Sequence, residues 1–519
     1  MRLMPRLAAT AVGFLAAAAL AAPGQAAVDT RPDIQPLPAN LEAQRATEAT
    51  GLYGNPAIKP IDARKTGVIT MGDSEISGEG AGNYEPGTHQ DGNWCDRSRD
   101  QAVWRLTIPV DVRYNVACSG GQPSDLVYGG THQWQELNQG ENLAIKARNT
   151  KLKLIWVVVG ANGSGNIEFG PVATDCAKRR IFFQGVCWPT YTDAWKARAE
   201  HTRQQVEWAV NDIKQTMTNA GYLASDYKIS LMGYPSPISP DVEDNPNFPG
   251  WYSGGCTIYL ADAAFGRNKA VPIFESAERR AAQNTGVMYL DASRLFHGHE
   301  VCTETTWARG IYIENGNIFD ENAARQSAHP NAAGHGAFAE CMSAFYNSGL
   351  QTATCVDPGN TNHGAIFPGL FEFRQLRVGG QCLDAEGYNS RYDTQLLAWP
   401  CHGGRNQGFW YDSATKALHV ELNHDRCVDA AGGTLGVGTK LVLWDCHLGA
   451  NQKWTLDTNG IHPASRTDLC VAFDGAADGS WARLAACNGG THQKWSFESR
   501  NFPNPAGYNY NDFIGSRVY

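Results

Sequence analysis

Apolar residues follow two different periods in the first two thirds of the chain. Short runs rich in β-branched residues at 68–71, 152–159 and 228–232 predict buried strands. Longer segments at 192–220 and 330–348 carry their apolar residues on one helical face, which predicts helices. Alternation of strands with helices predicts an α/β domain, in which helices cover a mostly parallel sheet in three layers.

The N-terminal segment has the pattern of an export signal. Arg2 and Arg6 precede an apolar, Ala-rich run at 7–22, and small residues continue to Ala27. We therefore expect a signal peptide at 1–27 and a secreted protein. A retained membrane anchor is the alternative, but the run is short for a bilayer span, so we expect no integral membrane association. Residues 28–65 lack periodicity and are interpreted as an extended lead-in.

Length, net charge and cysteine content limit the possible domain organisation, partners and cofactors. A chain of 519 residues is too long for one hydrophobic core, so two or more domains are expected. The formal net charge is −9, which argues against nucleic acid and anionic lipid as main partners. The 14 cysteines behind an export signal predict disulfides. Because no Cys-x-x-Cys pair occurs, we expect no zinc ribbon, and we predict neither a metal nor a cofactor.

The last third of the chain contains an internal repeat. After a Gly- and Asn-rich linker at 356–369, three units of similar length fill 370–498. Each unit has two cysteines and closes with Gln-x-aromatic, in which the glutamines are Gln407, Gln452 and Gln493. Three such units predict a fold with threefold pseudosymmetry, because one unit alone cannot bury its apolar face. We assign no structure to the tail at 499–519.

One serine occupies a position suited to catalysis. Ser74 lies in Met71-Gly-Asp-Ser-Glu-Ile-Ser-Gly-Glu-Gly80, directly after a predicted strand. A serine there projects above the carboxyl edge of the sheet, where α/β proteins bind ligands. Taken alone, Gly-Asp-Ser is also an ordinary turn.

This stretch and three later blocks, in the expected order, resemble the GDSL/SGNH hydrolases, above all their secreted actinobacterial branch. The later blocks are Asn115-Val-Ala-Cys-Ser-Gly120, Gly160-Ala-Asn162 and His329-Pro-Asn-Ala-Ala-Gly-His335. The resemblance covers about residues 65–350, and we place the hydrolase domain at 66–355. It implies Ser74 as the nucleophile, and the amides of Ser74 and Gly120 with the Asn162 side chain as oxyanion donors.

A histidine must act as the base that takes the serine proton. The resemblance favours His329, which precedes a predicted helix, over His299 and His335. The family usually has Asp three residues before this histidine, but here the residue is Gln326. Some members of the branch use a backbone carbonyl there, so we expect the Gln326 carbonyl to fix the tautomer in a Ser–His dyad rather than a full triad.

The repeats resemble the ricin B-type lectins, which are β-trefoils. The Gln-x-aromatic rings then belong to the core, while sugar needs a carboxylate, an exposed aromatic face and an amide. The third repeat has Ala472, Ala485 and His492 at these positions, so it is expected to be degenerate. The alternative is that all three repeats only stabilise the fold. The two competent sites are predicted from Asp384, Trp399, Asn406 and Gln407, and from Asp429, Trp444, Asn451 and Gln452.

The two resemblances also suggest how the cysteines pair. The hydrolase branch implies neighbouring pairs, and each lectin repeat implies one internal pair. The predicted disulfides are Cys95–Cys118, Cys176–Cys187, Cys256–Cys302, Cys341–Cys355, Cys382–Cys401, Cys427–Cys446 and Cys470–Cys487.

These features together predict a secreted serine esterase with a sugar-binding module. The leading hypothesis is removal of short acyl groups, such as acetyl, from a polysaccharide or glycoconjugate to which the lectin attaches. A lipase or phospholipase that uses the lectin only for attachment is one alternative. A secreted lectin whose hydrolase domain has decayed is the other, and the absence of Asp at position 326 is its only support.

Overall fold

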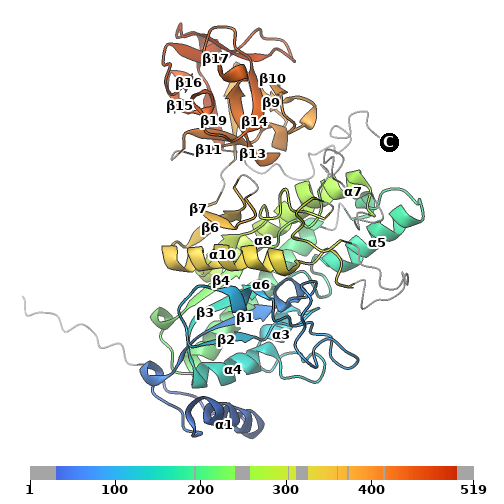
Figure 1. The fold of residues 1–519 in the computed structure, drawn as a ribbon, viewed down its shortest axis with the longest axis vertical. Helices are drawn as coiled ribbons and strands as arrows, with labels where there is room; N and C mark the ends of the chain where they lie inside the picture. The colour runs from blue at the N-terminus through green and yellow to red at the C-terminus, as the bar shows by residue number, and fades with distance from the viewer. Residues whose placement is uncertain are drawn as a thin grey trace, which may run out of the picture.

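The chain forms two bodies in a computed structural model, one α/β and one all-β (Figure 1). The structure describes residues 31–191, 195–239, 257–301, 303–310, 325–358, 361–370, 373–412 and 415–499. The predicted signal peptide lies outside these ranges, and so does the predicted tail except for its first residue, Ser499. Among the described residues, no helix has the length and apolar character needed to cross a membrane.

A seven-stranded sheet in the order β2-β1-β3-β4-β5-β6-β7 forms the centre of the first body. All neighbours are parallel except β6 and β7, which confirms the predicted mostly parallel α/β fold. The strands are β1 (Thr66–Gly72), β2 (Val112–Asn115), β3 (Lys151–Val158), β4 (Lys228–Met232), β5 (Met288–Asp291), β6 (Thr352–Val356) and β7 (Ala365–Pro368). The antiparallel β7 is formed by residues of the predicted linker.

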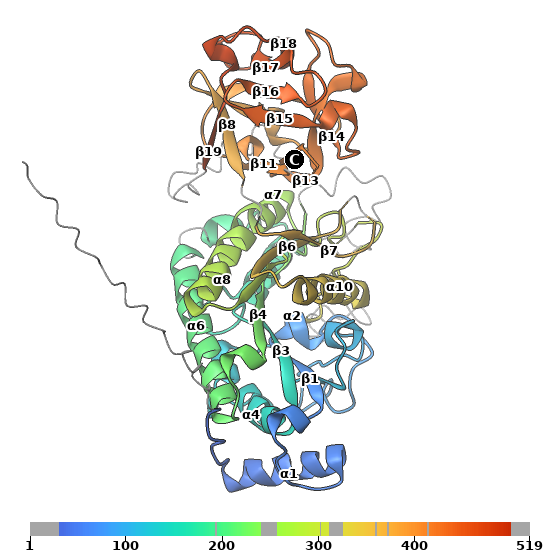
Figure 2. The ribbon, with the colours of Figure 1, turned by 90° about the vertical axis from the view of Figure 1, so that its left-hand side faces the viewer.

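Helices cover both faces of this sheet, as Figure 2 shows for α6 on one side and α10 on the other. Successive residues of β3 alternate between two apolar cores: Trp156 packs in the core that includes Phe338 of α10, and Val157 packs with Val206 of α6. The helices are α1 (Ala39–Tyr53), α2 (Ser74–Ser77), α3 (Pro123–Leu126), α4 (Gln139–Asn149), α5 (Phe169–Ile181), α6 (Trp195–Asn219), α7 (Leu260–Phe265), α8 (Val271–Thr285) and α10 (Ala332–Ser348).

The predicted extended lead-in is wrong over residues 39–53, which form α1. This helix packs on α4 through polar contacts: Arg45 donates to the side chain of Asn149 (3.0 Å), and Lys146 pairs with Glu48 (2.5 Å). Polar packing of this kind leaves no apolar period in the sequence.

The second body is all-β and confirms the predicted trefoil class. An eight-stranded sheet includes β19 next to β8, so the last described strand closes against the first, and two hairpins complete the fold. The Gln-x-aromatic rings Phe409 and Trp454 are fully buried, as core residues should be. The strands are β8 (Arg374–Val378), β9 (Gln381–Ala385), β10 (Thr394–Pro400), β11 (Phe409–Asp412), β12 (Ala417–Val420), β13 (Asn423–Ala430), β14 (Leu441–Asp445), β15 (Trp454–Asp457), β16 (Gly460–Pro463), β17 (Leu469–Phe473), β18 (Ala482–Ala486) and β19 (Ser496–Ser499).

Buried arginines join the two bodies. Arg294 of the α/β body donates to the Glu421 carbonyl of the trefoil (2.9 Å), and Arg405 of the trefoil donates to the Arg267 carbonyl (3.5 Å). Burial lowers the pKa of Arg294 to about 9, and the Glu421 carboxylate at 3.9 Å counteracts this effect. The contact therefore includes directional polar interactions, and Phe367 of β7 also packs edge-on against Trp410 of the trefoil.

Candidate functional sites

A sharp turn at the end of β1 positions Ser74. Gly72 has φ 140°, and a Cβ atom there would lie 1.9 Å from the Val158 carbonyl oxygen, so only glycine fits. The Asp73 side chain then caps α2 by accepting from the Glu75 amide (3.1 Å). Ser74 is thus the first residue of α2, at the carboxyl edge of the sheet.

The imidazole of His329 faces this serine. Its Nε2 lies 2.8 Å from Ser74 Oγ, and its Nδ1 lies 3.1 Å from the Ser327 carbonyl oxygen. Because a carbonyl only accepts, Nδ1 carries the hydrogen, which leaves the Nε2 lone pair for the serine hydroxyl. The ring therefore has the tautomer that a base for Ser74 requires.

The role expected for Gln326 is taken by its neighbour. The carbonyl that accepts from His329 is that of Ser327, because Ala328 has φ 62° and this left-handed residue turns the carbonyl back toward the ring. The Gln326 side-chain oxygen instead accepts from Tyr84 Oη (2.9 Å) and Arg309 Nη1 (2.7 Å). The expected backbone interaction thus shifts by one residue.

The two competing histidines, His299 and His335, are buried and packed against aromatic rings. Each ring nitrogen of His299 faces an oxygen acceptor, Asp357 Oδ2 at 2.6 Å and the Thr305 carbonyl at 2.7 Å, and the ring stacks on Trp307. The Trp307 carbonyl in turn accepts from the Asn331 amide (2.8 Å), next to the His329 loop. His335 is buried against Phe338, and its ring makes no hydrogen bond within the described part of the chain.

Two buried carboxyl residues, Glu79 and Asp96, lie near His329, and sequence reasoning missed them. Glu79 Oε2 lies 3.8 Å from His329 Nε2 and accepts a hydrogen bond from Ser119. Arg325 pairs with Asp96 (2.9 Å) and lies 3.6 Å from Glu79. Burial raises the pKa of Glu79, while Arg325 counteracts that shift. The sequence does contain a signal for Glu79, because it is a charged residue in the glycine-rich block that follows Ser74.

Burial lowers the pKa of His329 to about 4, although hydrogen bonds to the backbone of Ser327 and Arg325 act in the opposite direction. An enzyme that uses neutral His329 should therefore keep its kcat/KM for an aryl acetate from about pH 7 to 5 and lose half near pH 4. If the imidazole had its ordinary pKa, kcat/KM would instead fall to half at about pH 6.5. Initial rates across this range, corrected for irreversible inactivation, test the expectation. The loss of kcat/KM near pH 4 should persist in the Asp73→Asn variant, because the pKa of Asp73 is about 7.

Asn162 follows β3 and lies beside the serine turn. Its Nδ2 is 3.3 Å from the Gly121 carbonyl oxygen and 3.5 Å from Asp73 Oδ2. Asp73 also accepts from the Tyr234 hydroxyl, and burial raises the pKa of Asp73 to about 7. The amide of Asn162 is thus placed between the residue before Ser74 and the residue after Gly120.

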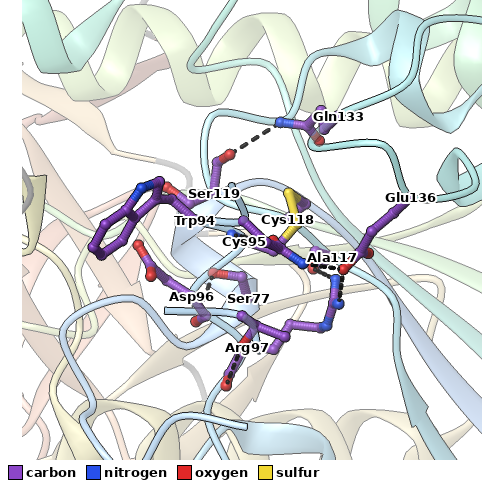
Figure 3. The surroundings of a disulfide bond; sticks show 12 residues. Ser77, Trp94, Cys95, Asp96, Arg97, Ala117, Cys118, Ser119, Gln133 and Glu136 are labelled. Carbon is purple, nitrogen blue, oxygen red and sulfur yellow. Dashed lines mark hydrogen bonds and ion pairs between the residues drawn. A yellow bond between two sulfur atoms is a disulfide. The ribbon is translucent and has the colours of Figure 1, made fainter. Parts of the chain in front are cut away.

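The loop that carries Gly120 is braced by a disulfide. Cys95–Cys118 joins it to the segment after Trp94, and Figure 3 shows the polar contacts around this bond. Gln133 Nε2 donates to the Ser119 carbonyl (3.0 Å), and Gly120 itself is exposed with φ 75°. The structure contains six of the seven predicted pairs, and Cys256–Cys302 lies outside the described residues.

The first two trefoil repeats contain matching polar clusters. Asp384 accepts from Asn406 Nδ2 and Gln407 Nε2, both at 2.8 Å. Asp429 accepts from Asn451 and Gln452 at the same distances. Trp399 is 43% exposed and Trp444 is 37% exposed, so both present part of a ring to solvent.

Each of these clusters also contains a histidine that sequence reasoning missed. His402 Nε2 lies 3.3 Å from Asp384, and His447 Nε2 lies 3.4 Å from Asp429. Both follow the second cysteine of their repeat, where the third repeat has Asn488. The third repeat thus lacks both the histidine and the aspartate, since Ala472 replaces the aspartate.

Comparisons with known proteins agree with this division. Residues 418–506 match the ricin-type beta-trefoil lectin domain family. A lipase of Streptomyces rimosus is 23% identical over 294 residues, which are 56% of this chain and 93% of that protein. The crystal structure of the extracellular S. rimosus lipase matches 52% of this chain and 94% of its own at 20% identity, with a TM-score of 0.35. An earthworm R-type lectin C-half in complex with GalNAc matches 25% and 98% at 22% identity, with a TM-score of 0.21. The chain therefore carries a ricin-type β-trefoil lectin domain behind an α/β domain that is similar in sequence to a Streptomyces lipase.

Proposed function

We propose that this protein is a secreted serine esterase that hydrolyses acyl esters with a Ser74–His329 dyad and attaches to glycans through its trefoil. The observation that carries the proposal is the contact of 2.8 Å between Ser74 Oγ and His329 Nε2, with Nδ1 held by a carbonyl. In a hydrolase domain that had lost its activity, nothing would preserve this tautomer together with this contact.

The chemistry follows from these positions. Ser74 Oγ attacks the ester carbonyl while its proton passes to His329 Nε2, and the resulting oxyanion accepts from the amides of Ser74 and Gly120 and from Asn162. The imidazolium gives the proton to the departing alkoxide, and the carbon–oxygen bond breaks to leave acyl-Ser74. Water then attacks the acyl group and loses a proton to Nε2. The acid departs, and the proton returns to Ser74 Oγ.

The trefoil clusters support a role in attachment to sugar. Asp384 and Asp429 are buried carboxylates oriented by two amides each, and an exposed tryptophan lies in the same repeat. Vicinal hydroxyls can donate to such a carboxylate while the sugar ring stacks on the indole. Attachment would raise the local concentration of the esterase at a polysaccharide surface. This is why we favour short acyl groups on glycans as the substrate.

The main competing substrate is a long-chain lipid ester, which the name of the S. rimosus relative favours. Initial rates on p-nitrophenyl acetate, butyrate, octanoate and palmitate separate the two. We expect kcat/KM to be highest for acetate or butyrate. A maximum at octanoate or palmitate would replace the acetylesterase proposal with the lipase one.

The role of the trefoil is tested on acetylated xylan at low enzyme concentration. Asp384→Asn together with Asp429→Asn should lower acetate release about tenfold or more, since attachment no longer concentrates the enzyme. Hydrolysis of p-nitrophenyl acetate should stay unchanged. The matched control is His492→Ala in the degenerate third repeat, which should behave as wild type on both substrates. Equal acetate release by all three proteins would reject targeting to this glycan.

A further inference from the structure

Two neighbouring phenylalanines project from the end of α5. The side chains of Phe182 and Phe183 are 54% and 74% exposed, and Gln184 and Gly185 after them are exposed as well. An exposed phenylalanine has no polar group that could compensate for its contact with water, and two in succession form an apolar tip. We call Phe182 and Phe183, together with Lys178, Arg179 and Arg180, the Phe tip.

A disulfide and backbone hydrogen bonds brace the Phe tip. The Cys176–Cys187 disulfide closes the segment, and the Phe182 amide donates to the Lys178 carbonyl (2.9 Å). The Gln184 amide donates to the Arg179 carbonyl (2.8 Å). Phe183 has φ 55°, a left-handed conformation that is costly for a bulky residue and directs this ring outward. Bracing of this kind reduces the conformational entropy that the tip would lose when its rings are buried in a partner.

The charge of the Phe tip is opposite to that of the whole protein. The formal net charge of the chain is −9, yet residues 175–187 contain three basic side chains and one acidic side chain, Asp175. Arg179 pairs with Asp175 (2.9 Å), and Arg180 lies over the rings of Phe183 and Tyr259. Lys178 is exposed. The net negative charge of the whole chain argues against anionic lipid as a partner. The Phe tip nevertheless combines basic and apolar side chains in one place.

We propose that the Phe tip docks the protein on an anionic lipid surface. Phenyl rings that enter the boundary between headgroups and acyl chains gain apolar burial, and the adjacent basic side chains meet the phosphates. A lipid surface fits better than a folded protein, because the Phe tip is much smaller than the roughly 20 to 30 residues that each side of a stable protein interface contributes.

The position of the Phe tip connects docking to the candidate active site. The α5 helix begins seven residues after Asn162, in the segment that follows the carboxyl end of β3. Docking through the Phe tip would therefore use a helix whose preceding segment contains the candidate oxyanion donor Asn162.

Vesicle sedimentation tests the proposal on the full chain with Ser74→Ala, so that no lipid is hydrolysed and the result does not depend on the esterase proposal. We expect binding to phosphatidylglycerol vesicles at low salt and much weaker binding to phosphatidylcholine vesicles. Phe182→Ser with Phe183→Ser should lower the partition coefficient at least tenfold, and Lys178→Gln should lower it about fivefold at low salt only.

The matched control is Trp208→Ser on α6, a tryptophan that is 46% exposed outside the Phe tip. It should bind vesicles as the parent does. Unchanged sedimentation of the double phenylalanine variant, or an equal loss with Trp208→Ser, would overturn the proposal. So would equal binding to both lipids, since charge then has no role. Correct folding of each variant is checked by its melting temperature and, with Ser74 restored, by its rate on p-nitrophenyl acetate.

Discussion

Replacement of Ser74 by alanine is expected to lower kcat/KM for p-nitrophenyl acetate by about 10⁴- to 10⁶-fold. In the proposed mechanism the hydroxyl is the attacking atom, and it also donates to His329 Nε2 at 2.8 Å. Without it no acyl-enzyme can form, and only the oxyanion donors remain to assist attack by water. Stopped-flow release of p-nitrophenol should show a burst in wild type, if deacylation is slow, and none in the variant.

The companion variant His329→Ala should lose a similar factor, and the double variant should lose little more. Serine and histidine act as one unit, so their effects do not add. Retention on a sugar column by all three proteins shows that the trefoil is intact. If Ser74→Ala kept more than about a tenth of the activity, the nucleophile would have to be another residue.

The sequence predicts those elements whose burial is apolar and periodic. Residues 228–232 were expected as a strand and form β4, and the predicted strand at 152–159 differs from β3 by one residue at each end. Helix α1 was missed because its buried positions are Leu41, Arg45 and Ala49, one of which is charged. In α5 the single buried residue is Cys176. Such helices are positioned by ion pairs and a disulfide, which leave no hydrophobic period to find.

The candidate active site also contains some features that the sequence predicts and others that it does not. The family resemblance of the ordered blocks singles out Ser74 and His329, and the structure places Ser74 Oγ 2.8 Å from His329 Nε2. The switch from Gln326 to Ser327 depends on the left-handed backbone of Ala328, which alanine rarely adopts and no pattern encodes. The approach of Glu79 to His329 depends on Arg325 and Ser119, contacts between segments far apart in the chain. The sequence therefore predicts the contact between Ser74 and His329 better than the contacts that surround it.

Asn162→Ala is the variant with the next largest expected effect, a loss of about 100- to 1000-fold in kcat. The Asn162 amide is held between Gly121 and Asp73, so it needs no reorganisation when negative charge develops on the substrate oxygen. Because that charge exists only in the transition state, KM should change little. Separate values of kcat and KM for p-nitrophenyl acetate and butyrate test both parts of the expectation.

Ser164→Ala is the matched control, because Ser164 is exposed on the same loop and should leave kcat unchanged. A loss confined to KM would mean that Asn162 binds the substrate in its ground state rather than the oxyanion. Asp73→Asn separates the amide from its support: it keeps the polar contact with Asn162 but removes the acid that titrates near pH 7. If Asn162 is the donor and Asp73 only positions it, Asp73→Asn should cost much less than Asn162→Ala and should remove any change in kcat around pH 7.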